Sequence, residues 1–277
     1  MQAVPVDYDN EETLVSALRG QQFLIVTLSI HAAPDTHGKI IRAAAKAGVQ
    51  HVMPNVYTCD IVLNNAALGD EVMMRGMHTP TIQDMESQGL AYTVLVCGLW
   101  YEFSLACPPD FLGFDIAKRE VVLFDEGNHQ VNMSTWTQLG RGVAAFLSLK
   151  LLPEDENDTS PTVAGYRNKP LYVSSFHASQ RDILASVMRV TGTTESDWKV
   201  TTQSSDERVA EGMRQVSQGN LLGMATAYYS RMFSQRGQDA VFEGKLDNGR
   251  LGLGREDMDE ATGRAVGMVE DGWNPHQ

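Results

Sequence analysis

Strands alternate with helices along the first hundred residues, and this order constrains the fold more than any other feature. Three segments of strand character stand at residues 23–29, 49–55 and 90–100 (FLIVTLS, VQHVMPN and LAYTVLVCGLW), and the first of them is a continuous apolar run. Continuous apolar runs are typical of strands that are covered on both faces in a parallel sheet. Helical segments are predicted between them, at residues 38–47 and 72–88. The alternation predicts an α/β fold with a parallel, Rossmann-like sheet and right-handed crossovers.

The N-terminal segment follows the same pattern. Residues 3–8 are predicted to form a short strand, and Asp9 and Asn10 are candidates for a helix cap. The helix that follows has an apolar stripe at Leu14, Val15 and Leu18, and Gly20 is expected to end it.

The order changes after residue 100. Residues 119–134 are predicted to form a hairpin, and Ser134 or Thr135 to cap a helix that runs to Leu149. Residues 151–162 are an acidic loop, 169–179 have strand character, and 179–191, 205–218 and 256–271 have helical character. We therefore expect a nucleotide-binding domain over 1–100 and a substrate-binding lid over 101–277, with residues 169–178 returning to the sheet.

Charge excludes several classes of partner. The chain has 22 Lys and Arg against 35 Asp and Glu, a net charge of −13, which disfavours nucleic acid and anionic membranes. No apolar run approaches the roughly 20 residues that span a bilayer. No secretory signal is recognisable and the three cysteines lack metal-type spacing, so we expect a cytoplasmic protein with reduced thiols. The two histidines near residue 35 lack a third ligand, and no metal site is expected.

A glycine-rich phosphate loop is hard to find. The nearest match to GxGxxG is Gly140, Gly142 and Ala145, in the stretch LGRGVAAF. These residues fall inside the helix that Ser134 or Thr135 caps, whereas a phosphate loop joins a strand to a helix. We therefore expect no dinucleotide role for this motif.

Several stretches resemble the fungal branch of the NmrA-like and isoflavone-reductase-like family of atypical short-chain dehydrogenases. They cover nearly the whole chain, and the most specific are CGLWYEFSL at residues 97–105 and the Ser-Gln-Arg-Asp segment at 179–182. The resemblance implies an NAD(P)H-dependent oxidoreductase, with NADPH favoured over NADH. The implied substrate is a small aromatic or polyketide-type secondary metabolite, reduced at a carbonyl or a conjugated double bond.

The resemblance also implies that part of the domain is missing. A strand like residues 3–8 is the third of the family's sheet, so about fifty residues with the phosphate-binding loop would precede it. Residues 23–29 would then form an exposed sheet edge. A fragment, a shortened protein with a differently closed sheet and a relative without cofactor are three explanations, and we favour the first.

The resemblance places the remaining site residues at strand ends. The cofactor-binding residues that it implies lie in two loops: Thr27, Leu28 and Ser29, and Pro54, Asn55, Val56 and Tyr57. Such loops follow the carboxyl ends of parallel strands, where ligands are expected on physical grounds too, although plain turn chemistry is the alternative. Trp100, Tyr101 and Glu102 are candidates for substrate binding, with core packing as the equal alternative.

The catalytic lysine of isoflavone reductases corresponds to His78 in this chain. A histidine at that position can act as a general acid or hydrogen-bond donor, although a solvated surface histidine is the simpler interpretation. Because the lysine is absent, a dinucleotide-sensing regulator with a protein partner and a truncated, non-catalytic pseudoenzyme remain alternatives to the enzyme.

Overall fold

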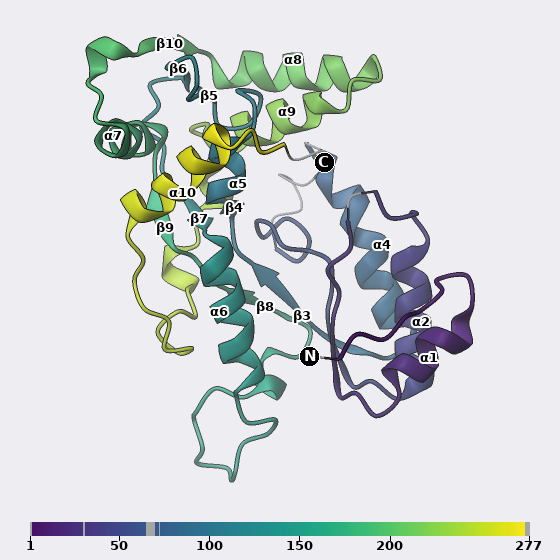
Figure 1. Ribbon diagram of the computed structural model, residues 1–277. Helices are drawn as coiled ribbons and strands as arrows, with labels where there is room; N and C mark the ends of the chain where they lie inside the picture. Colours follow the sequence, from purple (N-terminus) through teal and green to yellow (C-terminus); the bar gives the residue numbers. More distant parts are fainter. Residues whose placement is uncertain (1, 30, 65–69, 72, 275–277) are drawn as a thin grey trace.

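A four-stranded parallel sheet forms the centre of the computed structural model, which describes residues 2–29, 31–64, 70–71 and 73–274. Its strands are β1 (Phe23–Ile25), β2 (His51–Met53), β3 (Ala91–Val96) and β8 (Lys169–Tyr172), in the order β1-β2-β3-β8. Every neighbouring pair is parallel. The predicted α/β class with a Rossmann-like sheet is therefore confirmed (Figure 1).

Helices cover both faces of this sheet. Helices α1 (Glu11–Leu18), α2 (Thr36–Ala47) and α4 (Met74–Ser87) lie on one side in Figure 1, and α6 (Trp136–Leu147) lies on the other. Alternate residues of β3 point to opposite sides: Val94 packs with the α2 and α4 core, and Leu95 packs with Phe146 of α6. This two-sided burial explains why the strands read as continuous apolar runs.

Local signals set the ends of two of these helices. Gly48 adopts a left-handed conformation, with φ of 84°, and its backbone N–H bonds to the carbonyls that end α2. The Thr135 side chain accepts a hydrogen bond from the backbone N–H of Gln138 and so caps α6. The predicted helix start at Ser134 or Thr135 is confirmed at Thr135.

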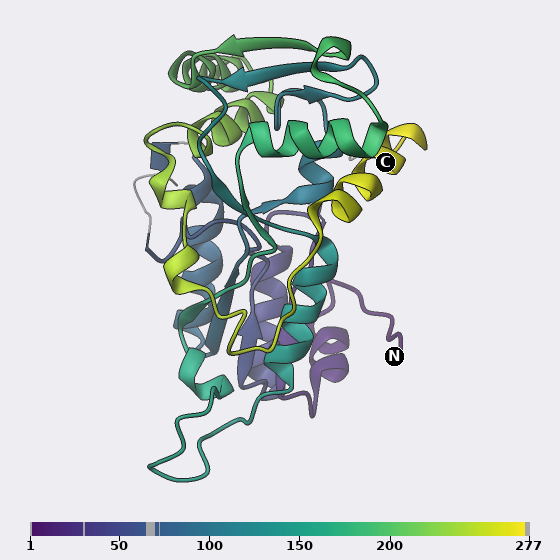
Figure 2. The same cartoon turned by 90° about the vertical axis from the view of Figure 1, so that its left-hand side faces the viewer.

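A second part of the molecule lies above the carboxyl ends of the sheet (Figures 1 and 2). It contains two three-stranded sheets. One sheet has the order β10-β6-β5, with β10 at Lys199–Gln203, β6 at Glu120–Phe124 and β5 at Phe114–Asp115. The other has the order β4-β7-β9, with β4 at Leu99–Trp100, β7 at Val131–Ser134 and β9 at Phe176–Ala178. Around them lie α5 (Tyr101–Ala106), α7 (Gln180–Thr191), α8 (Ser205–Ser217), α9 (Leu222–Met232) and α10 (Met258–Glu270). Short 3-10 turns occur at Val163–Tyr166, Glu195–Asp197, Gly237–Ala240 and Glu243–Lys245.

The predicted strand at residues 3–8 is wrong. Residues 2–7 have no regular structure, and residues 2–10 are exposed. A strand needs a neighbour to satisfy its backbone groups, and β1 pairs with β2 alone among the described strands. The expectation that residues 23–29 lie at a sheet edge is confirmed, although β1 spans just three of them.

The predicted hairpin at residues 119–134 is also wrong. Its two halves form β6 and β7, which belong to different sheets: β6 lies between β10 and β5, and β7 lies between β4 and β9. Asp125 and Gly127 have positive φ angles of 54° and 70° and redirect the chain between the two strands. Partners from distant parts of the sequence therefore replace the local pairing that the pattern favoured.

Candidate active site at the carboxyl ends of the strands

One side chain joins the loops that follow β1 and β2. The Asn55 amide accepts a hydrogen bond from the Leu28 backbone N–H at 3.1 Å and donates one to the Leu28 carbonyl at 3.3 Å. Tyr57 adds a second link, because its hydroxyl donates to the Val26 carbonyl at 2.8 Å. The loops at residues 27–29 and 54–57, which the family resemblance selects, are thus joined at one edge of the sheet.

A row of aromatic rings begins beside this pair of loops. The indole N–H of Trp100 donates to the Tyr57 carbonyl at 3.0 Å. Ring centroids then lie 5.9 Å apart from Trp100 to Phe103, 5.7 Å from Phe103 to Trp273, and 6.4 Å from Trp273 to Trp136. We call these four residues the aromatic row. Trp136 keeps 42% of its surface exposed, so the row ends in a ring that faces solvent.

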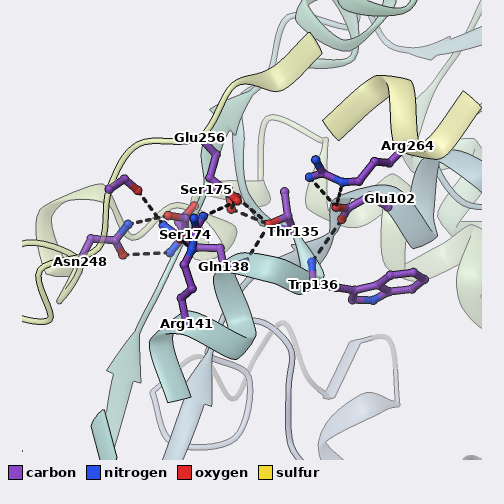
Figure 3. Close-up of polar contacts among 11 residues, drawn as sticks. Glu102, Thr135, Trp136, Gln138, Arg141, Ser174, Ser175, Asn248, Glu256 and Arg264 are labelled. Atoms are coloured by element: carbon purple, nitrogen blue, oxygen red, sulfur yellow. Dashed lines mark hydrogen bonds and ion pairs between the residues drawn. The ribbon is translucent and has the colours of Figure 1, made fainter. Parts of the chain in front are cut away.

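Tyr101 and Glu102, the other two substrate-binding candidates, lie in the core. Tyr101 has no exposed surface, and its hydroxyl lies 2.6 Å from the Thr262 hydroxyl. Burial raises the pKa of Tyr101 to about 12. The Glu102 carboxylate accepts from the Arg264 guanidinium and from the Trp136 backbone N–H, so it joins α5, α10 and the start of α6 (Figure 3).

His78 lies near the start of α4, the helix that leads into β3. Because helix and strand run in opposite directions, the start of α4 lies at the same edge of the sheet as the two loops. Burial, and then the neighbouring imidazole of His37, lower the pKa of His78. Its imidazole is therefore neutral at physiological pH and carries a single N–H donor.

A carboxylate that the sequence did not single out lies near the aromatic row. Glu256 accepts hydrogen bonds from the hydroxyls of Thr135 and Ser175 and pairs with the Arg141 guanidinium, each at 2.5 Å (Figure 3). These contacts fasten the segment before α10 to the first turn of α6. The helix cap was visible in the sequence, but its partner lies more than a hundred residues away, and no local pattern points to it.

The residues present fit part of a dinucleotide site. The loops after β1 and β2 lie at the carboxyl edge of the sheet, where open α/β sheets bind ligands, and the Asn55 amide holds them together through the Leu28 backbone. Gly140 and Gly142 lie inside α6, as the sequence predicted, and in the described ranges no glycine-rich turn joins one of the parallel strands to a helix. The residues described thus include two joined loops where a ligand is expected and no phosphate loop.

Two further properties bear on the class of protein. Among the residues that the structure describes, no cluster of three or more His, Cys, Asp or Glu side chains could hold a metal ion. Within the same residues, no helix combines the length and the apolar character needed to cross a membrane. Cys59, Cys97 and Cys107 are all buried and form no disulfide.

Comparison with known proteins gives one curated relative and many similar structures. No family model matches the sequence. Oxidoreductase aprR of Aspergillus flavus is 26% identical over 220 residues, which cover 79% of this chain and 67% of that protein. A structure from work on pinoresinol-lariciresinol and phenylcoumaran benzylic ether reductases is 17% identical, with a TM-score of 0.70 over 94% of this chain and 81% of its own.

Two more structures agree with this result. Isoflavone reductase is 18% identical, with a TM-score of 0.64 over 94% of this chain and 80% of its own. The quinone oxidoreductase QOR2 of Escherichia coli, complexed with NADPH, is 19% identical, with a TM-score of 0.65 over 96% of this chain and 84% of its own. At these identities the structural matches establish the fold.

Proposed function

We propose that this chain, which has the fold of the NmrA-like and isoflavone-reductase-like atypical short-chain dehydrogenases, is an NADP(H)-dependent oxidoreductase. Its substrate in this proposal is a small aromatic or polyketide-type metabolite, reduced at a carbonyl or a conjugated double bond. The observation that carries the proposal is the pair of loops joined by Asn55, with the aromatic row beside them.

The two loops would hold the nicotinamide end of the cofactor. The reciprocal hydrogen bonds between Asn55 and Leu28 fix the spacing of the loops in advance, so less ordering is required when a ligand binds. NADPH supplies a hydride when it is bound. That similar structures were solved with NADP(H), including QOR2 and a triphenylmethane reductase, supports NADPH as the cofactor.

His78 would serve as the donor to the reduced oxygen. Its lowered pKa keeps the ring neutral, so the imidazole N–H can donate a hydrogen bond to an oxygen on which negative charge develops. A lysine at this position would place a full positive charge there. The histidine therefore gives weaker stabilisation of the oxyanion than a lysine would.

The aromatic row would bind the substrate. Partly exposed rings in edge-to-face contact present flat apolar surfaces, on which an aromatic substrate can stack with a gain of about 1 kcal/mol per ring pair. Trp136, the exposed end of the row, is the residue best placed to meet an incoming ligand.

The test is NADPH oxidation with a panel of aromatic ketones, quinones and enones. Replacement of His78 by Ala should lower kcat by about 10- to 100-fold, and replacement by Lys should restore turnover. Trp136→Ala should raise KM more than it lowers kcat. His31→Gln changes an exposed histidine of the same sheet edge and should leave both constants unchanged.

A dinucleotide-responsive regulator is the second candidate, and the replacement of the family lysine by His78 favours it. The same experiment separates the two functions. Saturable NADPH binding with no turnover on any substrate would contradict the oxidoreductase and support the regulator. Absence of NADPH binding both by this chain and by a version extended upstream would leave the third candidate, a non-catalytic pseudoenzyme. The division into a nucleotide-binding region at 1–100 and a lid at 101–277 is part of this proposal.

A further inference from the structure

A cavity of about 460 Å³ opens along the outer edge of the central sheet, beside β8. Lys169 and Pro170 at the start of β8 line it, together with the segment 159–166 and residues from the loop that contains Lys245 and Arg250. In the strand order β1-β2-β3-β8 this edge is the one farthest from β1, so the cavity does not adjoin the loops after β1.

The lysines of this chain differ in whether they form ion pairs with carboxylates. The sequence contains seven lysines. Five of them form ion pairs with carboxylates: Lys39, Lys46, Lys118, Lys150 and Lys199. The other two, Lys169 and Lys245, form no ion pair with any residue that the structure describes, and both line this cavity. In a protein of net charge −13, two lysines without carboxylate partners in one cavity call for an explanation.

The surroundings leave the two ammonium groups available. Lys169 donates to the Gly165 carbonyl, which satisfies one of its three donors. Lys245 lies over the Tyr172 ring, with 5.4 Å between its nitrogen and the ring centroid. The carboxylate of the lining, Asp247, is buried and accepts from the Tyr166 hydroxyl, the Tyr172 backbone N–H and the Arg250 guanidinium.

Asp158, the acidic residue just before the lining segment, is also occupied. Its carboxylate pairs with Lys150 and accepts from the backbone N–H and the hydroxyl of Ser160. The lining therefore carries more positive than negative charge, with Lys169, Lys245 and Arg250 against Asp247.

We propose that this cavity binds the phosphate group of a small phosphate monoester. Lysines bind phosphate as strongly hydrated point charges, and each of the two that line this cavity supplies one such charge. The Thr159 hydroxyl lies in the same lining and can add a neutral donor. The volume exceeds that of a phosphate group, and Pro161, Pro170 and Tyr166 provide apolar walls for the organic part of the ester.

The test uses phenyl phosphate as the probe, in titration calorimetry with the full chain. Lys169→Met and Lys245→Met should each weaken binding about tenfold, because each removes a charge-assisted contact. Lys118→Met removes the same charge at an exposed site elsewhere and should change the affinity less than twofold. All three lysines lie at the surface, and thermal melting of each variant checks that the fold is retained.

Three further results would each overturn the proposal. Benzoate binding as tight as that of phenyl phosphate would remove the preference for a phosphate dianion. A loss of affinity in Lys118→Met as large as in the cavity variants would indicate a nonspecific response to net charge. Displacement of the probe by saturating NADPH would assign the cavity to the cofactor. We expect weak benzoate binding, a silent control variant and no displacement, and we expect higher salt to weaken binding of the probe.

Discussion

Arg264 of α10 neutralises a carboxylate that the fold has removed from water. The Glu102 side chain is 3% exposed, and its oxygen lies 2.9 Å and 3.1 Å from two nitrogens of Arg264. A buried ion pair adds little net stability over an apolar pair, but removal of one partner leaves an uncompensated charge. The Glu102–Arg264 ion pair therefore favours one packing arrangement of α5 against α10, beside the aromatic row.

Substitution of Arg264 by Met should lower the free energy of unfolding by about 3 kcal/mol. Urea denaturation at pH 7 measures this value. Lys199→Met breaks an exposed pair with Glu120 and should cost at most about 1 kcal/mol. Equal losses in the two variants would show that Glu102 is not desolvated as described.

His51 of β2 should make the free energy of unfolding depend on pH below neutrality. Its ring stacks on Phe23 at 4.9 Å and lies 2.8 Å from the Thr93 hydroxyl, and burial lowers its pKa from 6.5 to about 4. Below pH 6.5 the unfolded chain binds a proton that the folded chain does not. Stability should therefore fall between pH 6.5 and 4, by about 2 kcal/mol once screening by nearby solvent is allowed for.

The His51→Gln variant isolates this contribution. Its free energy of unfolding should depend less steeply on pH between 6.5 and 4 than that of the unchanged protein, measured by urea denaturation across this range. His31→Gln, at an exposed position, should keep the original slope. Parallel curves for the His51 variant and the unchanged protein would contradict the assignment.

At the scale of elements, the connection between β3 and β4 depends on the backbone conformation of Gly98. The residue has φ of 68°, and a Cβ built there would lie 2.0 Å from the Asn132 carbonyl oxygen of the neighbouring strand β7. The two backbones can approach this closely because no side chain stands between them. Gly98 thereby allows the chain to leave the central sheet and enter the β4-β7-β9 sheet.

Gly98→Ala should destabilise the protein by more than about 3 kcal/mol, because both the φ angle and the contact oppose a side chain. Gly89 offers a matched control, since it has the same φ of 68° and a Cβ added there would meet no neighbouring atom within 4 Å. Gly89→Ala should cost about 1 kcal/mol. Thermal or urea unfolding compares the two, and similar losses would refute the role given to the Asn132 contact.

The success of sequence reasoning also differs between elements. Strands β1, β2 and β3 and the helices between them were predicted because the strands have apolar character and the helices carry stop signals such as Gly48, whereas the strand expected at residues 3–8 has no regular structure. The sequence pattern favoured pairing β6 with β7, and the true partners of these strands were missed. Strands β10 and β9, which pair with β6 and β7 respectively, come from later parts of the chain. Helix α9 was missed because it is buried on most sides and shows little amphipathic pattern.

The candidate site divides in the same way. The loops at 27–29 and 54–57 could be placed together, because parallel strands bring their carboxyl ends to one edge. Of the four residues of the aromatic row, the sequence singled out Trp100 and none of the other three. Trp136 and Trp273 meet through tertiary packing of α6 and the segment after α10, which no local pattern encodes.

At the scale of the whole molecule, two parts meet at the carboxyl ends of one parallel sheet. The lower part provides the two loops joined by Asn55, and the upper part provides most of the aromatic row. Edge strand β1 lies beside these loops, and edge strand β8 carries the basic cavity. The two proposed ligands would therefore bind at separate ends of the sheet.

Titration calorimetry of the 277-residue chain with NADPH is the decisive experiment for the proposed cofactor site. We predict weak but saturable binding, because the described residues contain no phosphate loop, and Asn55→Ala should weaken it about tenfold further, because the variant loses both hydrogen bonds between the loops. Lys245→Met, at the far edge of the sheet, should leave NADPH binding unchanged. Absence of NADPH binding, or equal affinity in the unchanged chain and the Asn55 variant, would contradict the proposed site.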